Sequence, residues 1–344
     1  MLAAVAVSAV AAPGAAFAAS PPSLASSFTP ATIPVGGTSA LSFTITNPNA
    51  SGSISGIAFT DTLPAGLVVD NPAGANGTCG SAGTLTAVPG SNTITLTGGK
   101  LAGGASCTVS AGVTSSAPGV VQNSVGGVTS GSGNGSGDTQ SLTVAANPTV
   151  TLTSPKDGST FDFGQKVIAH YSCAEGTLGP GLTACSGDAD NGTPIDTSTA
   201  GPQTFSVSAI SNDGAVVTTT VNYTVRPDNH FTVSVVKVHR DGSLGIAVKV
   251  PGPGKVAVLE SAPIANLAAV THLPGPGKGR FAFGSTKLSV TDAGTFRLTV
   301  KPTRKGTQLV RKHHTKVLVR LEVLYTPTGG LGRLVSVGGV FVTK

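Results

Sequence analysis

"SALSFTITNPN", residues 39–49, carries an apolar side chain at every second position of its centre. These side chains are Leu41, Phe43 and Ile45, and the residues between them are serine or threonine. Because successive side chains of a strand point to opposite faces of a sheet, this period of two predicts a half-buried strand. The same alternation returns in "NTITLTGG" (92–99), "SCTVSAGV" (106–113) and "QSLTVAAN" (140–147). We therefore expect short strands joined by turns.

The composition of the whole chain favours the same fold class. Its 344 residues include 47 glycines and 23 prolines, but only three glutamates, no tryptophan and one methionine. Helices favour periodic runs of Ala, Leu, Glu, Lys and Met, whereas Thr, Val and Ser between Gly and Pro favour strands and turns. We predict an all-β protein of three tandem immunoglobulin-like (Ig-like) β-sandwich domains, since one such sandwich takes about 100 residues.

The first nineteen residues, "MLAAVAVSAVAAPGAAFAA", resemble a secretory signal peptide. An apolar run ends in Pro-Gly and is followed by Ala16-Phe17-Ala18, which fits an A-x-A cleavage site. No Lys or Arg precedes the apolar run, so an Ala-rich tail of low complexity is the alternative. We predict export after removal of residues 1–19, and no transmembrane segment in the mature protein.

The charges divide the chain at residue 226. Residues 1–225 hold three basic and ten acidic side chains, a net charge of −7, whereas residues 226–344 hold eighteen basic and five acidic ones, a net charge of +13. We predict domains at 20–146, 147–225 and 226–344. The glycine-rich segment "GSGNGSGD" (131–138) fits either a long hairpin turn or a flexible linker.

The first predicted domain resembles a known family. The blocks "FTITNPN", "FTDTLPAGL" and "CTVS" are similar to a repeat domain of unknown function found in secreted and surface proteins of bacteria, and the resemblance covers residues 23–145. It implies an Ig-like domain that serves as a stalk or an adhesive module. It implies no catalytic residue.

The other two predicted domains show weaker resemblances. Residues 147–225 open with "PTVTLTSPKDGSTFDFGQKVIAHYSC" and resemble a bacterial Ig-like domain with a short layout of seven strands. Residues 226–344 also contain seven candidate strands and resemble basic β domains at the C-termini of exported actinobacterial proteins. The segment "SAPIANLAAV" (261–270) could add one helical turn there.

The cysteines are predicted to form structural disulfides. An even number of cysteines in an exported chain favours disulfides, and the spacing of these four lacks the C-x-x-C pairs of a zinc site. Three pairings are possible, and the domain boundary near residue 147 favours Cys79–Cys107 and Cys173–Cys185.

We find no motif that indicates catalysis, a cofactor or a metal. A nucleophile elbow, an H-E-x-x-H motif and a phosphate-binding loop are all missing from the sequence. In "SGDADNG" (186–192), Asp188 and Asp190 suggest a calcium loop, but the fifth position is Gly192 and no glutamate follows where an EF-hand needs one. Asp-Asn-Gly is also an ordinary turn sequence. We expect a protein that is not an enzyme and needs no cofactor.

Basic residues near the C-terminus form the candidate binding site. If "PTRKGT" (302–307) were a hairpin turn, the outward side chains of both strands would lie on one sheet face with two cations at its tip. The predicted polyanion-binding residues are Arg297, Lys301, Arg304, Lys305, Lys312, His314, Lys316 and Arg320. The alternative is a solvated edge strand whose charges prevent aggregation.

The candidate ligands differ in how well the sequence fits them. A basic surface takes nucleic acid by default, but export and the lack of interleaved aromatic residues argue against that partner, and we expect no nucleic acid. All three tyrosines (Tyr171, Tyr223 and Tyr325) fall on inward strand positions, which disfavours a neutral-sugar site. We therefore predict an exported structural or adhesive module at the cell surface or outside the cell. The alternative is a module that binds an anionic cell-wall or matrix polymer.

Overall fold

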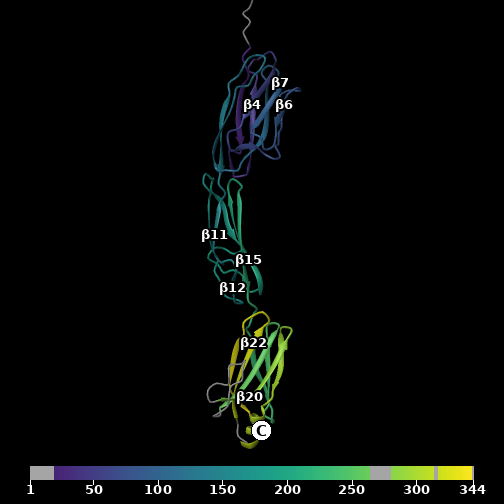
Figure 1. Ribbon diagram of the computed structural model, residues 1–344, viewed down its shortest axis with the longest axis vertical. Coiled ribbons are helices and arrows are strands. Elements are labelled where there is room, and N and C mark those ends of the chain that lie inside the picture. Colours follow the sequence, from purple (N-terminus) through teal and green to yellow (C-terminus); the bar gives the residue numbers. More distant parts are fainter. Residues whose placement is uncertain (1–18, 264–279, 314–316, 343–344) are drawn as a thin grey trace, which may run out of the picture. The chain divides into compact units, whose positions relative to one another are not determined.

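The computed structural model describes residues 19–263, 280–313 and 317–342 (Figure 1). The predicted signal peptide falls almost entirely outside these residues. The chain is all-β, as predicted, with one helix among the described residues. None of the described helices is long and apolar enough to cross a membrane.

Ten strands form three sheets between residues 23 and 145. The strands are β1 (Ser23–Thr29), β2 (Thr32–Pro34), β3 (Thr38–Thr46), β4 (Ile54–Thr62), β5 (Leu67–Val69), β6 (Thr84–Ala87), β7 (Thr93–Leu101), β8 (Ser106–Ser115), β9 (Gly119–Val125) and β10 (Asp138–Ala145). The sheet orders are β1-β3-β8-β5, β2-β10-β9 and β4-β7-β6. The last of these sheets is labelled in Figure 1. Because β9 and β10 pair antiparallel on either side of residues 131–138, that glycine-rich segment is a hairpin connection rather than a linker.

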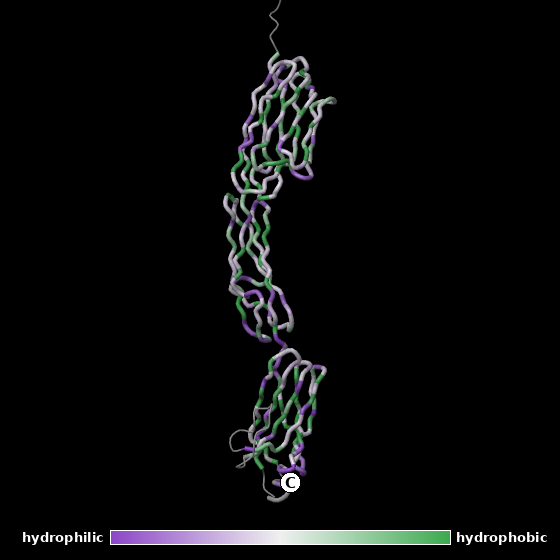
Figure 2. The backbone as a smooth tube through the Cα atoms, viewed as in Figure 1, coloured by the Kyte–Doolittle hydropathy of each residue, from purple (hydrophilic) through white to green (hydrophobic). Residues whose placement is uncertain are grey.

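The alternation in β3 produces the core between these sheets. Leu41, Phe43 and Ile45 are completely buried, as the period of two predicts. The ring of Phe43 lies 4.6 Å from the ring of Phe59 on β4, which belongs to another sheet. Figure 2 shows hydrophobic residues alternating with less hydrophobic ones along such strands. Apolar contacts between sheets therefore hold this part of the chain together.

Six strands lie between residues 149 and 225, where the sequence predicts seven. They are β11 (Thr149–Ser154), β12 (Ser159–Phe161), β13 (His170–Ala174), β14 (Leu182–Gly187), β15 (Gly201–Ser211) and β16 (Val216–Val225). They form sheets of order β11-β13 and β12-β16-β15-β14. The stretch after β14 supplies no seventh strand, because "DADNGTP" (188–194) forms bends and a turn and joins Ile168 only through an isolated bridge at Pro194. Thr193 N–H, for example, donates to Asp190 O at 3.0 Å.

Seven strands lie among the described residues of the basic part of the chain, as predicted. They are β17 (Thr232–Val238), β18 (Leu244–Val250), β19 (Gly254–Pro263), β20 (Arg280–Val290), β21 (Gly294–Val300), β22 (Val317–Pro327) and β23 (Arg333–Val342). Their sheet orders are β17-β18-β21 and β20-β19-β22-β23. Residues 261–263 belong to β19 and not to a helical turn, and the rest of that predicted turn lies outside the described residues.

The division into three domains stays a prediction. Each sheet of the described residues draws its strands from only one of the stretches 23–145, 149–225 and 232–342. The chain itself divides into two compact units, and the stretch 149–225 contributes to both. The first contains the residues up to Thr151 with Ser172–Cys185 and Ser208–Thr218, and the second contains Leu152–Tyr171, Ser186–Val207 and the residues from Thr219 onward.

Both predicted disulfides are present. Cys79 is bonded to Cys107, with 5.3 Å between their Cα atoms, and Cys173 is bonded to Cys185, with 5.8 Å. Cys107 lies on β8, whereas the carbonyl of Cys79 accepts a hydrogen bond from Lys100 N–H on β7 at 2.7 Å. Since β7 and β8 belong to different sheets, the first disulfide links the two sheets.

Candidate polyanion-binding surface

The predicted basic hairpin is wrong. Strand β21 pairs with β18, whereas β22 pairs with β19 and β23, so the two strands expected to be neighbours lie in different sheets. The residue directly opposite Arg297 is Ala247, not His314. Between the strands, the described residues include helix α1 (Arg304–His313), and β22 follows in the other sheet.

Local capping explains the helix at "PTRKGT". Thr303 acts as the N-cap, because its Oγ1 accepts a hydrogen bond from Gly306 N–H at 3.2 Å. Thr307 N–H donates to Thr303 O at 2.8 Å and begins the helical pattern. On the inner side of the helix, Val310 is 2% exposed and packs in one apolar cluster with Phe281 and Phe283. A capped helix that buries an apolar side chain replaces the tight turn.

The eight predicted residues are therefore dispersed. Arg297 is exposed on β21, and Lys301 is exposed just after that strand. Arg304 and Lys305 are exposed in the first turn of α1. Lys312 belongs to the last turn of α1, Arg320 lies on β22, and His314 and Lys316 fall outside the described residues.

Arg320 is engaged in an ion pair. Its Nη2 lies 3.2 Å from Glu322 Oε1, and the two side chains are 51% and 9% exposed. Glu322, expected on the outward face, is thus largely buried. Arg320 neutralises the negative charge of Glu322, which burial would otherwise destabilise. We therefore exclude Arg320 from the candidate surface.

The structure gathers a different set of cations on the three-stranded sheet. Arg297 of β21 faces the same side as Ala247 of β18, and Lys249, two residues further along β18, shares that side. Lys237 of β17 pairs with Gly245 and also points outward. Together with Lys301 these make up what we name the outer basic face. Its residues are Lys237, Lys249, Arg297 and Lys301, all exposed.

The outer basic face has no acidic residue among its strands. The sequences of β17, β18 and β21 contain neither Asp nor Glu. Diagonal neighbours on adjacent strands lie about 7–8 Å apart, which is comparable to the Debye length of about 8 Å at physiological salt. The positive charges of Lys249 and Arg297 therefore act together on a ligand.

Two of these cations were missed by sequence reasoning. Lys237 and Lys249 sit on outward positions of "FTVSVVKVH" and "LGIAVKV", and the alternation in each strand gives that orientation. The sequence has no local signal that places β18 beside β21, because the two strands are separated by β19 and β20 along the chain. Only the pairing brings Lys249 beside Arg297.

Two carboxyl groups are buried away from this surface. Glu260 is completely buried, neither of its carboxylate oxygens has a hydrogen-bond partner among the described residues, and burial raises its pKa to about 8. It pairs with Gly284, where an added Cβ would lie 2.6 Å from Glu260 Oε2. In the N-terminal stretch, burial raises the pKa of Asp61, while Asn123 Nδ2 donates to its Oδ2 at 2.7 Å and opposes that rise.

The tyrosines are buried, as their strand positions predict. Tyr171, Tyr223 and Tyr325 are 9%, 4% and 0% exposed. Each hydroxyl donates to a backbone carbonyl; that of Tyr223, for example, donates to Asp196 O at 2.7 Å. These rings therefore provide no exposed platform on which a sugar could stack.

The two aspartates of "SGDADNG" have structural partners. Asp188 Oδ2 accepts a hydrogen bond from Ser206 N–H at 2.7 Å, and Asp190 O closes the turn to Thr193. Within the described ranges, no three His, Cys, Asp or Glu side chains come together as metal ligands would.

The chain is similar to distant solved structures and, in its N-terminal stretch, to one family. No curated protein matches the chain. A putative membrane anchored protein from Corynebacterium diphtheriae is 12% identical, with 94% of this chain and 95% of that chain covered and a TM-score of 0.19. The major pilin subunit BcpA of Bacillus cereus is 8% identical, with 93% and 66% covered and a TM-score of 0.23. Residues 22–144 match the family described as "Domain of unknown function (DUF7933)", and this part of the chain is therefore similar to a domain of unknown function, as its sequence blocks predict.

Proposed function

We propose that the chain is an exported, non-enzymatic protein that serves as a structural or adhesive module at the cell surface or outside the cell. The two disulfides are the main support for export, because disulfides form and persist in oxidising compartments. Its support in the fold is a set of β-sheets with a continuous apolar core in the N-terminal stretch. Such stapled sandwiches withstand conditions outside the cell without a cofactor.

Fractionation of the producing cells tests this proposal. The protein should appear in the medium or the wall fraction, and alkylation without reduction should label none of its four cysteines. Labelling of intact cells with a reagent that does not cross membranes should modify its surface lysines. A cytoplasmic protein with alkylated cysteines would contradict the proposal.

A second candidate function is retention by charge on an anionic polymer of the cell envelope or matrix. The outer basic face favours it, because three of its exposed cations share one sheet face and the fourth, Lys301, directly follows β21. The strands of that face contain no carboxylate. Each cation that pairs with the polymer releases a counterion, as in the binding of nucleic acids. Binding by this face would therefore weaken as salt is added.

Heparin affinity at several salt concentrations tests this second function. We expect the triple variant Lys237→Thr, Lys249→Thr, Arg297→Thr to bind about tenfold more weakly at physiological salt and to lose about three units of the salt slope. Threonine keeps the strand propensity, so the sheet should still form.

The matched control removes three exposed cations elsewhere in the same part of the chain. These are Arg240 in a turn and Arg304 and Lys305 in α1, each replaced with Gln. Equal losses in the two triple variants would show that only net charge matters. If the unmodified protein fails to bind heparin at low salt, the second function is wrong.

A further inference from the structure

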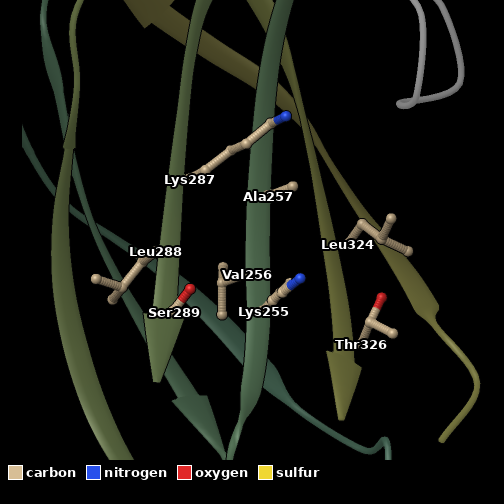
Figure 3. A pocket seen from close by; sticks show the side chains of 8 residues that line it. All are labelled: Lys255, Val256, Ala257, Lys287, Leu288, Ser289, Leu324 and Thr326. Atoms are coloured by element: carbon tan, nitrogen blue, oxygen red, sulfur yellow. The ribbon is translucent and has the colours of Figure 1, made fainter. Parts of the chain in front are cut away.

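A shallow groove lies on the outer face of the other sheet of the basic part, over strand β19. Its volume is about 330 Å³, and β19, β20 and β22 supply its walls (Figure 3). Its lining residues whose side chains lie on the outer face are Lys255, Ala257, Lys287, Ser289, Leu324 and Thr326. It is separate from the outer basic face, which belongs to strands β17, β18 and β21.

The hollow results from one small residue among larger neighbours. Ala257 on β19 pairs with Lys287 on β20 and with Leu324 on β22. One row along, Lys255 lies between Ser289 and Thr326 in the same way. The methyl group of Ala257 therefore forms a floor that longer side chains surround, as Figure 3 shows.

Two lysines give the groove its charge. Lys255 and Lys287 are exposed diagonal neighbours on adjacent strands, so their Cα atoms lie about 7–8 Å apart. Among the described residues, neither lysine forms an ion pair, and the carboxylate of β22, Glu322, is already paired with Arg320. Two like charges at this distance repel each other, and an anion between them would be attracted to both and offset that repulsion.

The chemistry of the walls selects the anion. Besides the two ammonium groups, the groove has two hydroxyl donors. They belong to Ser289 and Thr326, which lie on either side of Lys255. A phosphate group, with its several acceptor oxygens, uses more of these donors than a planar carboxylate does. Beside them, Ala257 and the half-buried Leu324 offer an apolar surface for a short carbon chain.

We propose that this groove binds a phosphate ester, with the phosphate between Lys255 and Lys287 and the carbon chain over Ala257 and Leu324. The ester is either a free phosphate monoester or one phosphodiester unit of a polymer, which share this chemistry. The inference does not depend on the outer basic face, and it adds a specific site to the proposed charge-driven binding.

Methyl NMR titration of the full chain tests the site with defined probes. Glycerol 3-phosphate, as the monoester, and a diester of two glycerols with phosphate should shift the methyl signals of Ala257 and Leu324. For ligands of this size we expect a Kd on the order of 1–10 mM. Glycerol should cause no shift at these concentrations, and glucuronate should bind about tenfold more weakly than glycerol 3-phosphate. Comparison of the two phosphate probes tells whether the free ester or the polymer unit is preferred.

Two variants separate a built site from general charge. Lys255→Thr with Lys287→Thr should weaken binding about tenfold, whereas Lys237→Thr with Lys249→Thr, on the other sheet, should change it by less than about twofold. Ala257→Ile keeps every charge and fills the floor, so it should also weaken binding about tenfold.

Unchanged binding by the Ala257→Ile variant, or equal losses in the two double variants, would overturn the proposal. Each variant is first compared with the unmodified chain by its methyl spectrum, and if the double variant at the groove is unfolded, Ala257→Ile decides. Heparin binding is measured separately. A negative result for the groove therefore does not contradict the charge-driven function, and a lack of heparin binding does not contradict the groove.

Discussion

Replacing Glu260 with Gln should stabilise the basic part of the chain at pH 9 and leave its stability nearly unchanged at pH 4. Burial raises the pKa of Glu260 from 4.5 to about 8, so the folded state binds a proton that the unfolded state has lost between these values. Stability from this group is complete below about pH 4.5 and is lost as the pH rises through 8. Over the 3.5 pH units between these two pKa values, the free energy of unfolding falls by at most about 5 kcal/mol.

The difference between variant and unmodified protein isolates this group from all others. Unfolding of residues 226–344 can be followed within the full chain by hydrogen exchange of the amides of β19 and β22 at pH 4 and pH 9. Glu260→Met, which also removes the two unpaired oxygens, should be more stable than the unmodified protein at pH 9. Asp292→Asn, at an exposed turn, is the control and should change stability by less than about 0.5 kcal/mol at either pH. A Glu260→Gln variant that loses stability equally at both pH values would contradict the prediction.

Removal of the Cys79–Cys107 disulfide should destabilise the N-terminal stretch by about 3.5 kcal/mol. The bond closes a loop of 28 residues, and the loop-closure entropy of the unfolded chain gives that value. It also links β8 to the sheet that contains β7. Because Cys79 is completely buried, both cysteines are replaced with Ala rather than with a polar residue.

The other disulfide provides the comparison. It closes a shorter loop of 12 residues, so its removal by two Ala substitutions should cost about 3 kcal/mol and affect mainly the amides of β13 and β14. The N-terminal stretch has neither Trp nor Tyr, so hydrogen exchange of β3 and β8 is the suitable measurement rather than fluorescence. If amides of β3 and β8 exchange at the same rate with and without the Cys79–Cys107 bond, this disulfide does not stabilise the fold as we expect.

Strand phase was predictable from the sequence because it depends on neighbouring residues alone. Val317, Val319, Leu321, Val323 and Tyr325 were expected on one face of a strand, and all are buried. The two disulfides were also predictable, since the predicted domain boundary near residue 147 separates the two cysteine pairs. These features need only the period of two and the order of residues along the chain.

Strand partners were not predictable, because they depend on residues far apart in sequence. "PTRKGT" has the composition of a turn, and only the buried position of Val310 beneath α1 and the cap at Thr303 make it the start of a helix. That helix sends β22 to the other sheet, which disperses the predicted basic face and leaves Arg297 beside Lys249 instead.

The charged groups show the same division between local and tertiary information. Alternation along β19 places Glu260 on the inward side with Val256 and Val258, so its direction follows from the sequence. The strands on either side of β19 decide two further features. Glu260 has no hydrogen-bond partner among the described residues, and on the opposite side Ala257 leaves a groove between two lysines. The sequence by itself determined which side chains point inward; the tertiary structure decided which of them meet, because pairing between sheets and strands rests on contacts that no local pattern encodes.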